Sequence, residues 1–69
     1  MIQEQDIIWI DQNQSIFLNV KLLPEQLHNL FRIYNEITGE NKRVTGCGRC
    51  VASVKKRVQA QFDKQTKIF

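Results

Sequence analysis

Hydrophobic residues recur with a helical period after Pro24. They follow the i, i+3, i+4, i+7, i+10 pattern of one buried helical face: Leu27, Leu30, Phe31, Tyr34 and Ile37. Pro24 suits the first turn of a helix, where its missing N–H costs nothing, and Gly39 readily takes the left-handed conformation that ends one. The pattern therefore predicts a helix over residues 24–38. Ile33 falls off this face, so we interpret it either as an isolated surface residue or as a contact for a partner.

A second helical pattern begins after the polar, turn-rich residues 39–46, which are a connector of ordinary length between packed helices. Thr45 is a suitable N-cap. The apolar residues that follow have spacings of 4, 3, 4 and 4: Cys47, Val51, Val54, Val58 and Phe62. We expect a helix over residues 47–65 that packs antiparallel against the first helix, with the two cysteines at the tip of the hairpin.

The first 22 residues carry short apolar runs instead. Residues 7–10 and 16–20 are rich in β-branched and aromatic side chains, and a polar stretch separates them. The simplest interpretation is two short strands, which must pack on the helices or on another chain because an isolated hairpin is marginal in water. Trp9 and Phe17 then either cover the domain's own core or form an apolar arm that docks on a neighbouring subunit.

These elements predict one small α+β domain over residues 1–69, with an N-terminal strand pair or extended arm (1–22) packed on an antiparallel two-helix hairpin. At 69 residues, a single core contributes only about 3–5 kcal/mol of net stability, so a metal, a second subunit or a larger assembly is a reasonable means of completing the fold. No apolar run approaches the roughly 20 residues of a membrane span, and the acidic start does not resemble a signal peptide.

The chain does not carry the residues that most enzymes need. It has one histidine, no combination of serine, histidine and aspartate suited to nucleophilic catalysis, and no glycine-rich phosphate loop before a helix. We therefore expect a binding protein with no enzymatic activity and no small-molecule substrate.

Charge is strongly polarised along the chain. The sequence has a net charge of +3, but residues 1–40 carry −4 and residues 41–69 carry +7. A small domain with this asymmetry attracts an anionic partner through its C-terminal part.

The basic residues of the second helix gather on the side opposite its apolar face. Arg49, Lys56 and Lys67 fall within roughly 20° of one another, in a row about 27 Å long. Four further basic residues flank or extend this row: Arg57, Lys64, Lys42 and Arg43. Such a face suits a phosphate backbone or an acidic protein surface, although a plain solvated helix face is the alternative. A membrane fits less well, since no exposed apolar stripe backs the basic face. Without a base-reading motif, nucleic-acid binding would tolerate any sequence.

Cys47-Gly48-Arg49-Cys50 is the one recognisable chemical motif. It supplies two of the four ligands of a structural zinc site, and His28 lies roughly 15 Å away along the first helix. A second copy could close a four-thiolate site, an arrangement similar to a zinc hook, or another protein could supply the missing ligands. A redox pair is a further alternative. The simplest interpretation is two small apolar residues that pack in a reducing compartment.

A succession of short motifs spans about residues 30–58: Tyr34-Asn35, Thr38-Gly39, Asn41-Lys42 and Cys47-x-x-Cys50, followed by Val51 and Val54. It resembles small proteins of tailed bacteriophages that infect Bacteroides-type hosts, in which such a succession joins two helices. The resemblance implies an origin rather than a mechanism, and it transfers no functional residue. It favours a minor virion component or an early protein that binds host or phage machinery.

The leading prediction is a phage-type binding protein that contacts nucleic acid or an acidic protein through its basic helix. The first alternative is a minor virion subunit, docked on a capsid or connector through Trp9, Phe17 and Ile33. The second is a homodimer bridged by zinc at Cys47 and Cys50. In each case we expect the host cytoplasm or the virion, with no secretion.

Overall fold

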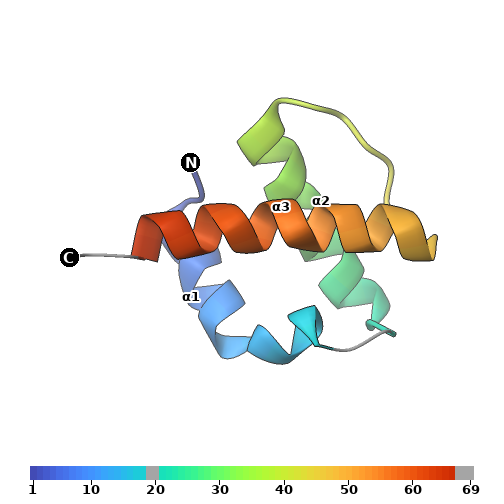
Figure 1. Ribbon diagram of the computed structural model, residues 1–69, viewed down its shortest axis with the longest axis horizontal. Coiled ribbons are helices and arrows are strands. Elements are labelled where there is room, and N and C mark those ends of the chain that lie inside the picture. The colour runs from blue at the N-terminus through green and yellow to red at the C-terminus, as the bar shows by residue number, and fades with distance from the viewer. Residues whose placement is uncertain (19–20, 67–69) are drawn as a thin grey trace.

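The computed structural model describes residues 1–18 and 21–66, and these residues form helices with no strand. The elements are α1 (Glu4–Gln12), the 3-10 helix η1 (Gln14–Phe17), α2 (Pro24–Thr38) and α3 (Gly48–Thr66). Figure 1 shows α3 running across the other elements, with α1 and η1 on one side of it. The predicted α+β fold is therefore wrong, and the domain is all-α over the described residues.

Residues 4–12 form α1 although their β-branched and aromatic side chains favour a strand. The buried positions, Ile2, Asp6 and Ile10, recur every four residues, which is a helical period. In a strand Ile8 would share a face with Asp6 and Ile10, whereas it is 52% exposed. Glu4 and Asp6 also lie in the first turn, where acidic side chains favour the helix dipole.

The polar stretch that was predicted to join two strands ends α1 and leads into η1. Asn13 Nδ2 donates to the Trp9 carbonyl at 2.8 Å, and Gln14 Nε2 donates to the Ile10 carbonyl at 3.1 Å, so two side-chain amides satisfy the last carbonyls of the helix. The second predicted strand, residues 16–20, overlaps η1. Residues 19–20 of that predicted strand lie outside the described residues. Trp9 and Phe17 are both half-buried and pack on the core of their own chain.

Helix α2 occupies the residues at which the sequence predicts it, 24–38. The Leu23 N–H donates to Gln26 Oε1 at 2.9 Å at its start, and Gly39 ends it with a φ of 73°. Ile33 is fully buried, so the prediction that it lies off the core face was wrong. The hydrophobic pattern predicted one packed face, whereas α2 is covered on two sides, by α3 and by the N-terminal elements.

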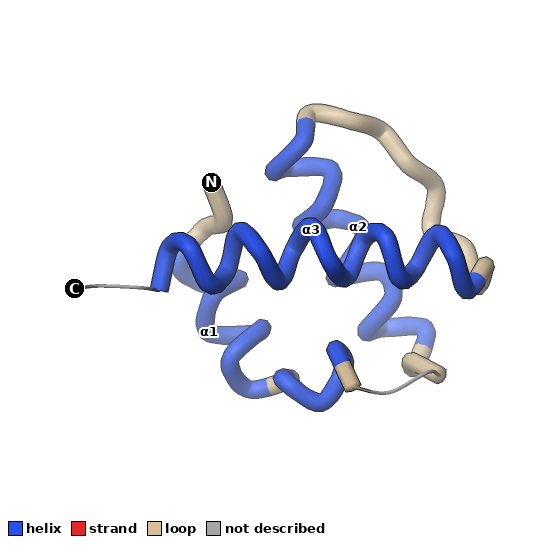
Figure 2. The backbone as a smooth tube through the Cα atoms, viewed as in Figure 1, coloured by secondary structure: helices blue, strands red, loops and turns tan. Residues whose placement is uncertain are grey.

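Helix α3 begins one residue later than predicted and buries Val51, Val54, Val58 and Phe62. It crosses α2 steeply instead of lying antiparallel beside it (Figure 1), so the predicted hairpin is wrong. The connector 39–47 makes a wide arc between the two helices (Figure 2). Nine extended residues can span up to about 30 Å, which is enough to carry the start of α3 away from the end of α2.

The core forms where the three helices and η1 meet. Its fully enclosed side chains come from every element: Ile10, Ile16, Leu30, Phe31, Ile33, Val54 and Val58. The carboxylate of Asp6 is buried at its edge and accepts hydrogen bonds from Arg32 at 2.8 and 3.1 Å, which fixes α1 to α2. This hydrogen bond raises the pKa of Arg32 above its usual value.

The N-terminus is joined to the end of α3 by a side-chain amide. Gln65 Oε1 accepts from the Ile2 N–H at 2.6 Å, and Gln65 Nε2 donates to the Ile2 carbonyl at 3.0 Å. Ile2 itself is buried, so the first residues belong to the packed domain. Among the described residues, no helix combines the length and apolar character that crossing a membrane requires.

Candidate functional site

The solvent-facing side of α3 carries two rows of basic side chains. Arg49 and Lys56 form one row and Arg57 and Lys64 the other, at about 100° per residue, and all four are exposed. The small residues Ser53 and Ala60, also exposed, lie between the rows. We call this set of six residues the outer face of α3. Its basic ends are about 22 Å apart along the helix.

The four cations of the outer face have no ion-pair partner in the part of the chain that the structure describes. Arg49, Lys56, Arg57 and Lys64 make no ion pair or hydrogen bond with any other side chain among the described residues. Most of the acids belong to the first 40 residues: Glu4, Asp6, Asp11, Glu25, Glu36 and Glu40. The acid within α3, Asp63, accepts a hydrogen bond from Gln59 Nε2 at 2.9 Å. Six of the seven acidic residues therefore lie outside α3.

Arg57 is the member of the outer face that shares a cleft with an acidic residue. This polar cleft has a volume of about 380 Å³, and Glu40 and Ser53 also line it. A ligand anion would therefore meet less positive potential beside Arg57 than beside Arg49 or Lys56.

The other predicted anion-binding residues are placed differently. Arg43 and Lys42 are exposed in the connector, and the Lys42 ammonium lies 5.2 Å from the centre of the Tyr34 ring. This cation–π contact holds Lys42 against α2. Lys67 lies outside the described residues.

The sequence predicts that the cysteines belong to the apolar face of the second helix, and the structure does not confirm this. Cys47 is exposed and lies one residue before α3, and Cys50 is half-buried in its first turn. Both thiols are free. Thr45 accepts a hydrogen bond from the Cys47 N–H at 3.2 Å but is not the N-cap, since α3 begins at Gly48.

The two thiols are in contact and have unequal acidity. Two hydrogen bonds lower the pKa of Cys47. The larger effect comes from the Cys50 thiol and the smaller from the Cys50 backbone N–H. The same thiol contact, together with desolvation, raises the pKa of Cys50. Among the described residues, no three His, Cys, Asp or Glu side chains come together as a metal site. A metal at this pair would therefore take its remaining ligands from a second copy or another protein, which stays a prediction.

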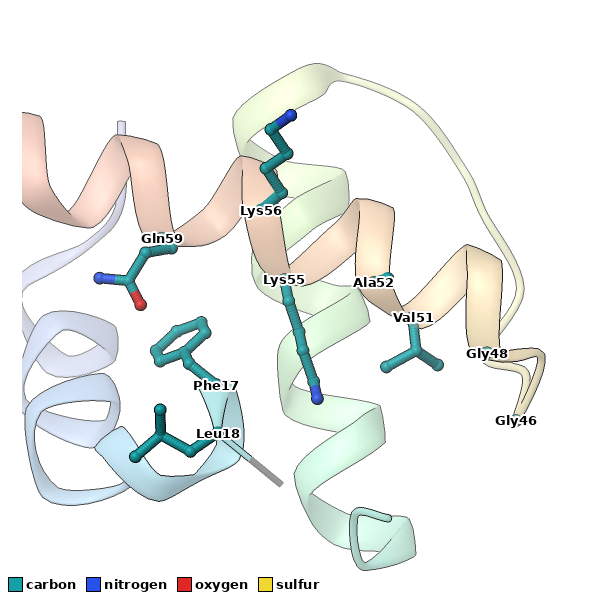
Figure 3. A pocket seen from close by; sticks show the side chains of 9 residues that line it. All are labelled: Phe17, Leu18, Gly46, Gly48, Val51, Ala52, Lys55, Lys56 and Gln59. Carbon is teal, nitrogen blue, oxygen red and sulfur yellow. The ribbon is translucent and has the colours of Figure 1, made fainter. Parts of the chain in front are cut away.

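A groove that the sequence did not reveal lies between η1 and the first half of α3. It has a volume of about 660 Å³, and nine residues line it: Phe17, Leu18, Gly46, Gly48, Val51, Ala52, Lys55, Lys56 and Gln59. Figure 3 shows Lys55 and Gln59 directed toward the side of the groove formed by Phe17 and Leu18, whereas Lys56 points away from it. Leu18 is 85% exposed. The groove could not be predicted because it needs η1 in place of a strand.

Comparison with known proteins finds no family model, no curated protein and no solved structure that matches the chain significantly.

Proposed function

We propose that this protein binds the phosphate backbone of nucleic acid along the outer face of α3, without reading the base sequence. The observation that carries the proposal is that four exposed cations share this face without a neutralising partner in the described part of the chain. Exposed helices that serve only solubility usually interleave both signs of charge. Here the potential is directed outward from one helix.

The shape of the outer face supports a backbone rather than a single anion. Ser53 and Ala60 have short side chains, so a strand can approach α3 closely between the two basic rows. The rows extend over about 22 Å, which is more than half of the roughly 34 Å turn of duplex DNA. Several phosphates would be contacted at once, and release of their counterions would drive binding.

Fluorescence anisotropy with a labelled 20-base-pair duplex tests this proposal. Four phosphate contacts predict that log K falls with log salt concentration with a slope of about −3.6. Lys56→Ala should weaken binding and reduce the magnitude of this slope by about 1. Lys21→Ala is the matched control, because Lys21 is exposed but precedes α2 instead of lying on the outer face.

Two unrelated duplex sequences should bind equally well, since the face contains no arrangement for reading base edges. No binding at low salt would overturn the proposal. So would equal losses for Lys56→Ala and Lys21→Ala, because net charge alone would then explain the affinity. Binding to an acidic polypeptide but not to the duplex would assign the same face to a protein partner instead.

A further inference from the structure

The cysteine pair has an arrangement that packing does not explain. Cys47 is exposed and Cys50 is half-buried, so neither belongs to the core. The Val51 N–H donates to the Cys47 carbonyl at 2.9 Å, which closes the first turn of α3 and places Cys47 and Cys50 at the same end of the helix. The two side chains are close enough for each thiol to shift the pKa of the other.

The two thiols differ in the way that an attacking and a resolving thiol differ. Cys47 is open to solvent and has the lowered pKa, so it supplies more thiolate near neutral pH. Cys50 is partly covered and keeps its proton to higher pH.

The surroundings of Cys47 favour its thiolate and leave it open to attack a partner. The positive end of the α3 dipole stabilises an anion at this position, and Arg49 is the next residue but one. Gly46 and Gly48 flank Cys47, and a Cβ built on either of them would meet no atom within 4 Å. A substrate sulfur can therefore approach Cys47 without a steric obstacle from these neighbours.

The groove of about 660 Å³ begins at the two glycines that flank Cys47 in the sequence. Gly46 and Gly48 line its end, and it continues along α3 past Ala52 to Gln59. Phe17 and Leu18 give it an apolar wall (Figure 3). It suits an extended peptide that has apolar residues next to its cysteine.

We propose that Cys47 and Cys50 are a redox-active dithiol that reduces a disulfide in a polypeptide whose apolar flanking residues bind the adjacent groove. The Cys47 thiolate attacks one sulfur of the substrate disulfide. The S–S bond breaks, a mixed disulfide forms, and the other substrate sulfur leaves as a thiolate that takes up a proton.

Cys50 completes the exchange. Its thiol loses a proton and attacks the Cys47 sulfur, which releases the second substrate sulfur as a thiol. The protein dithiol is oxidised by two electrons to the Cys47–Cys50 disulfide, and the substrate disulfide is reduced to two thiols. The reverse sequence, with a dithiol as reductant, restores the protein.

Glutathione disulfide is the probe for the chemical step. The reduced full-length chain is incubated with it, remaining thiols are alkylated, and the intact mass is measured. We expect the native protein to lose two hydrogens and retain no glutathione. Cys50→Ser should retain one glutathione on Cys47, and Cys47→Ser should react about tenfold more slowly than Cys50→Ser.

A native protein that retains glutathione on both cysteines would overturn the proposal, as would equal reaction rates for the two single variants. Circular dichroism of each variant verifies that the helices are intact. Both substitutions replace sulfur by oxygen outside the core, so little change in helix content is expected.

Two synthetic disulfide-linked peptide dimers test the role of the groove. One has leucine residues beside its cysteine, and the other has serine residues at the same positions. The first should react several-fold faster, and Leu18→Ser should remove this preference without changing the rate with glutathione disulfide. Leu23→Ser is the matched control, since Leu23 is 65% exposed but does not line the groove. Equal rates for the two peptides with the native protein would overturn the substrate assignment.

Discussion

The side-chain amide of Asn35 pairs with both backbone polar groups of Lys42. Asn35 Nδ2 donates to the Lys42 carbonyl at 3.0 Å, and the Lys42 N–H donates to Asn35 Oδ1 at 3.0 Å. The Lys42 ammonium then lies over Tyr34, whose hydroxyl donates to Glu40 Oε2 at 2.9 Å. The first part of the connector between α2 and α3 is therefore attached to the end of α2 through Glu40 and Lys42.

Asn35→Ala should lower the free energy of unfolding by about 1–2 kcal/mol, because two hydrogen bonds are lost. Urea denaturation followed by circular dichroism measures the change. Asn41→Ala is the control, because Asn41 is exposed in the same connector and makes no hydrogen bond with the described residues. Equal stability of the two variants would show that the Asn35 pairing does not hold the connector.

The ion pair between Asp6 and Arg32 predicts an asymmetric effect of mutation. Asp6 is 3% exposed, whereas the Arg32 side chain is 45% exposed. Arg32→Met leaves a buried carboxylate without its partner and should cost about 2–3 kcal/mol, less than for a fully buried pair because Arg32 is partly in water. Glu36→Ala removes only a 3.4 Å contact between exposed groups and should cost at most about 0.5 kcal/mol. Comparable losses for both variants in thermal denaturation would contradict this assignment.

How far the sequence predicts this fold depends on how many faces of each helix are packed. Helix α2 has clear end signals in Pro24 and Gly39, and its range was predicted correctly. Its burial was predicted only in part, because Ile33 packs on a second side. The packing of α1 includes the buried carboxylate of Asp6, which is satisfied by Arg32, a contact between residues 26 positions apart. The helix or strand propensity of neighbouring residues cannot predict such a long-range contact.

The candidate site was predictable to the extent that charge alone defines it. The basic side of the second helix follows from spacing, since exposed residues lie opposite the buried valines. The exposure of Cys47 did not follow, because its spacing from Val51 placed it on the apolar face. It lies one residue before the start of α3, so the helical spacing from Val51 does not apply to it.

Ile33 and Ile8 provide a direct test of the corrected core. Ile33→Ala should cost about 2–4 kcal/mol, since a fully buried side chain leaves a cavity. Ile8→Ala should change the free energy of unfolding by less than about 1 kcal/mol, because Ile8 is 52% exposed. Urea denaturation of the two variants measures both changes in the free energy of unfolding. A larger loss for Ile8→Ala would show that these side chains are placed wrongly.

The thiol pair predicts two different pH dependences of alkylation. In the native protein Cys47 should react with iodoacetamide at lower pH than an ordinary thiol, because its pKa is lowered chiefly by the hydrogen bond from Cys50. Cys50 should react at higher pH, because its pKa is raised by the same contact. Cys50→Ala removes the donor, so the pH midpoint of Cys47 alkylation should move upward. A midpoint that does not move, measured by peptide mass spectrometry, would contradict the contact.

Gln65 should control the order of the N-terminus. Its amide accepts from and donates to the backbone of Ile2, and its Oε1 also accepts from Gln61 Nε2 at 2.9 Å. Gln65→Ala should therefore cost about 1 kcal/mol and remove the hydrogen-exchange protection of the Ile2 amide. Gln12→Ala is the control, because Gln12 is exposed at the end of α1. If the Ile2 amide stays protected in Gln65→Ala, burial of the Ile2 side chain alone holds the N-terminus in place.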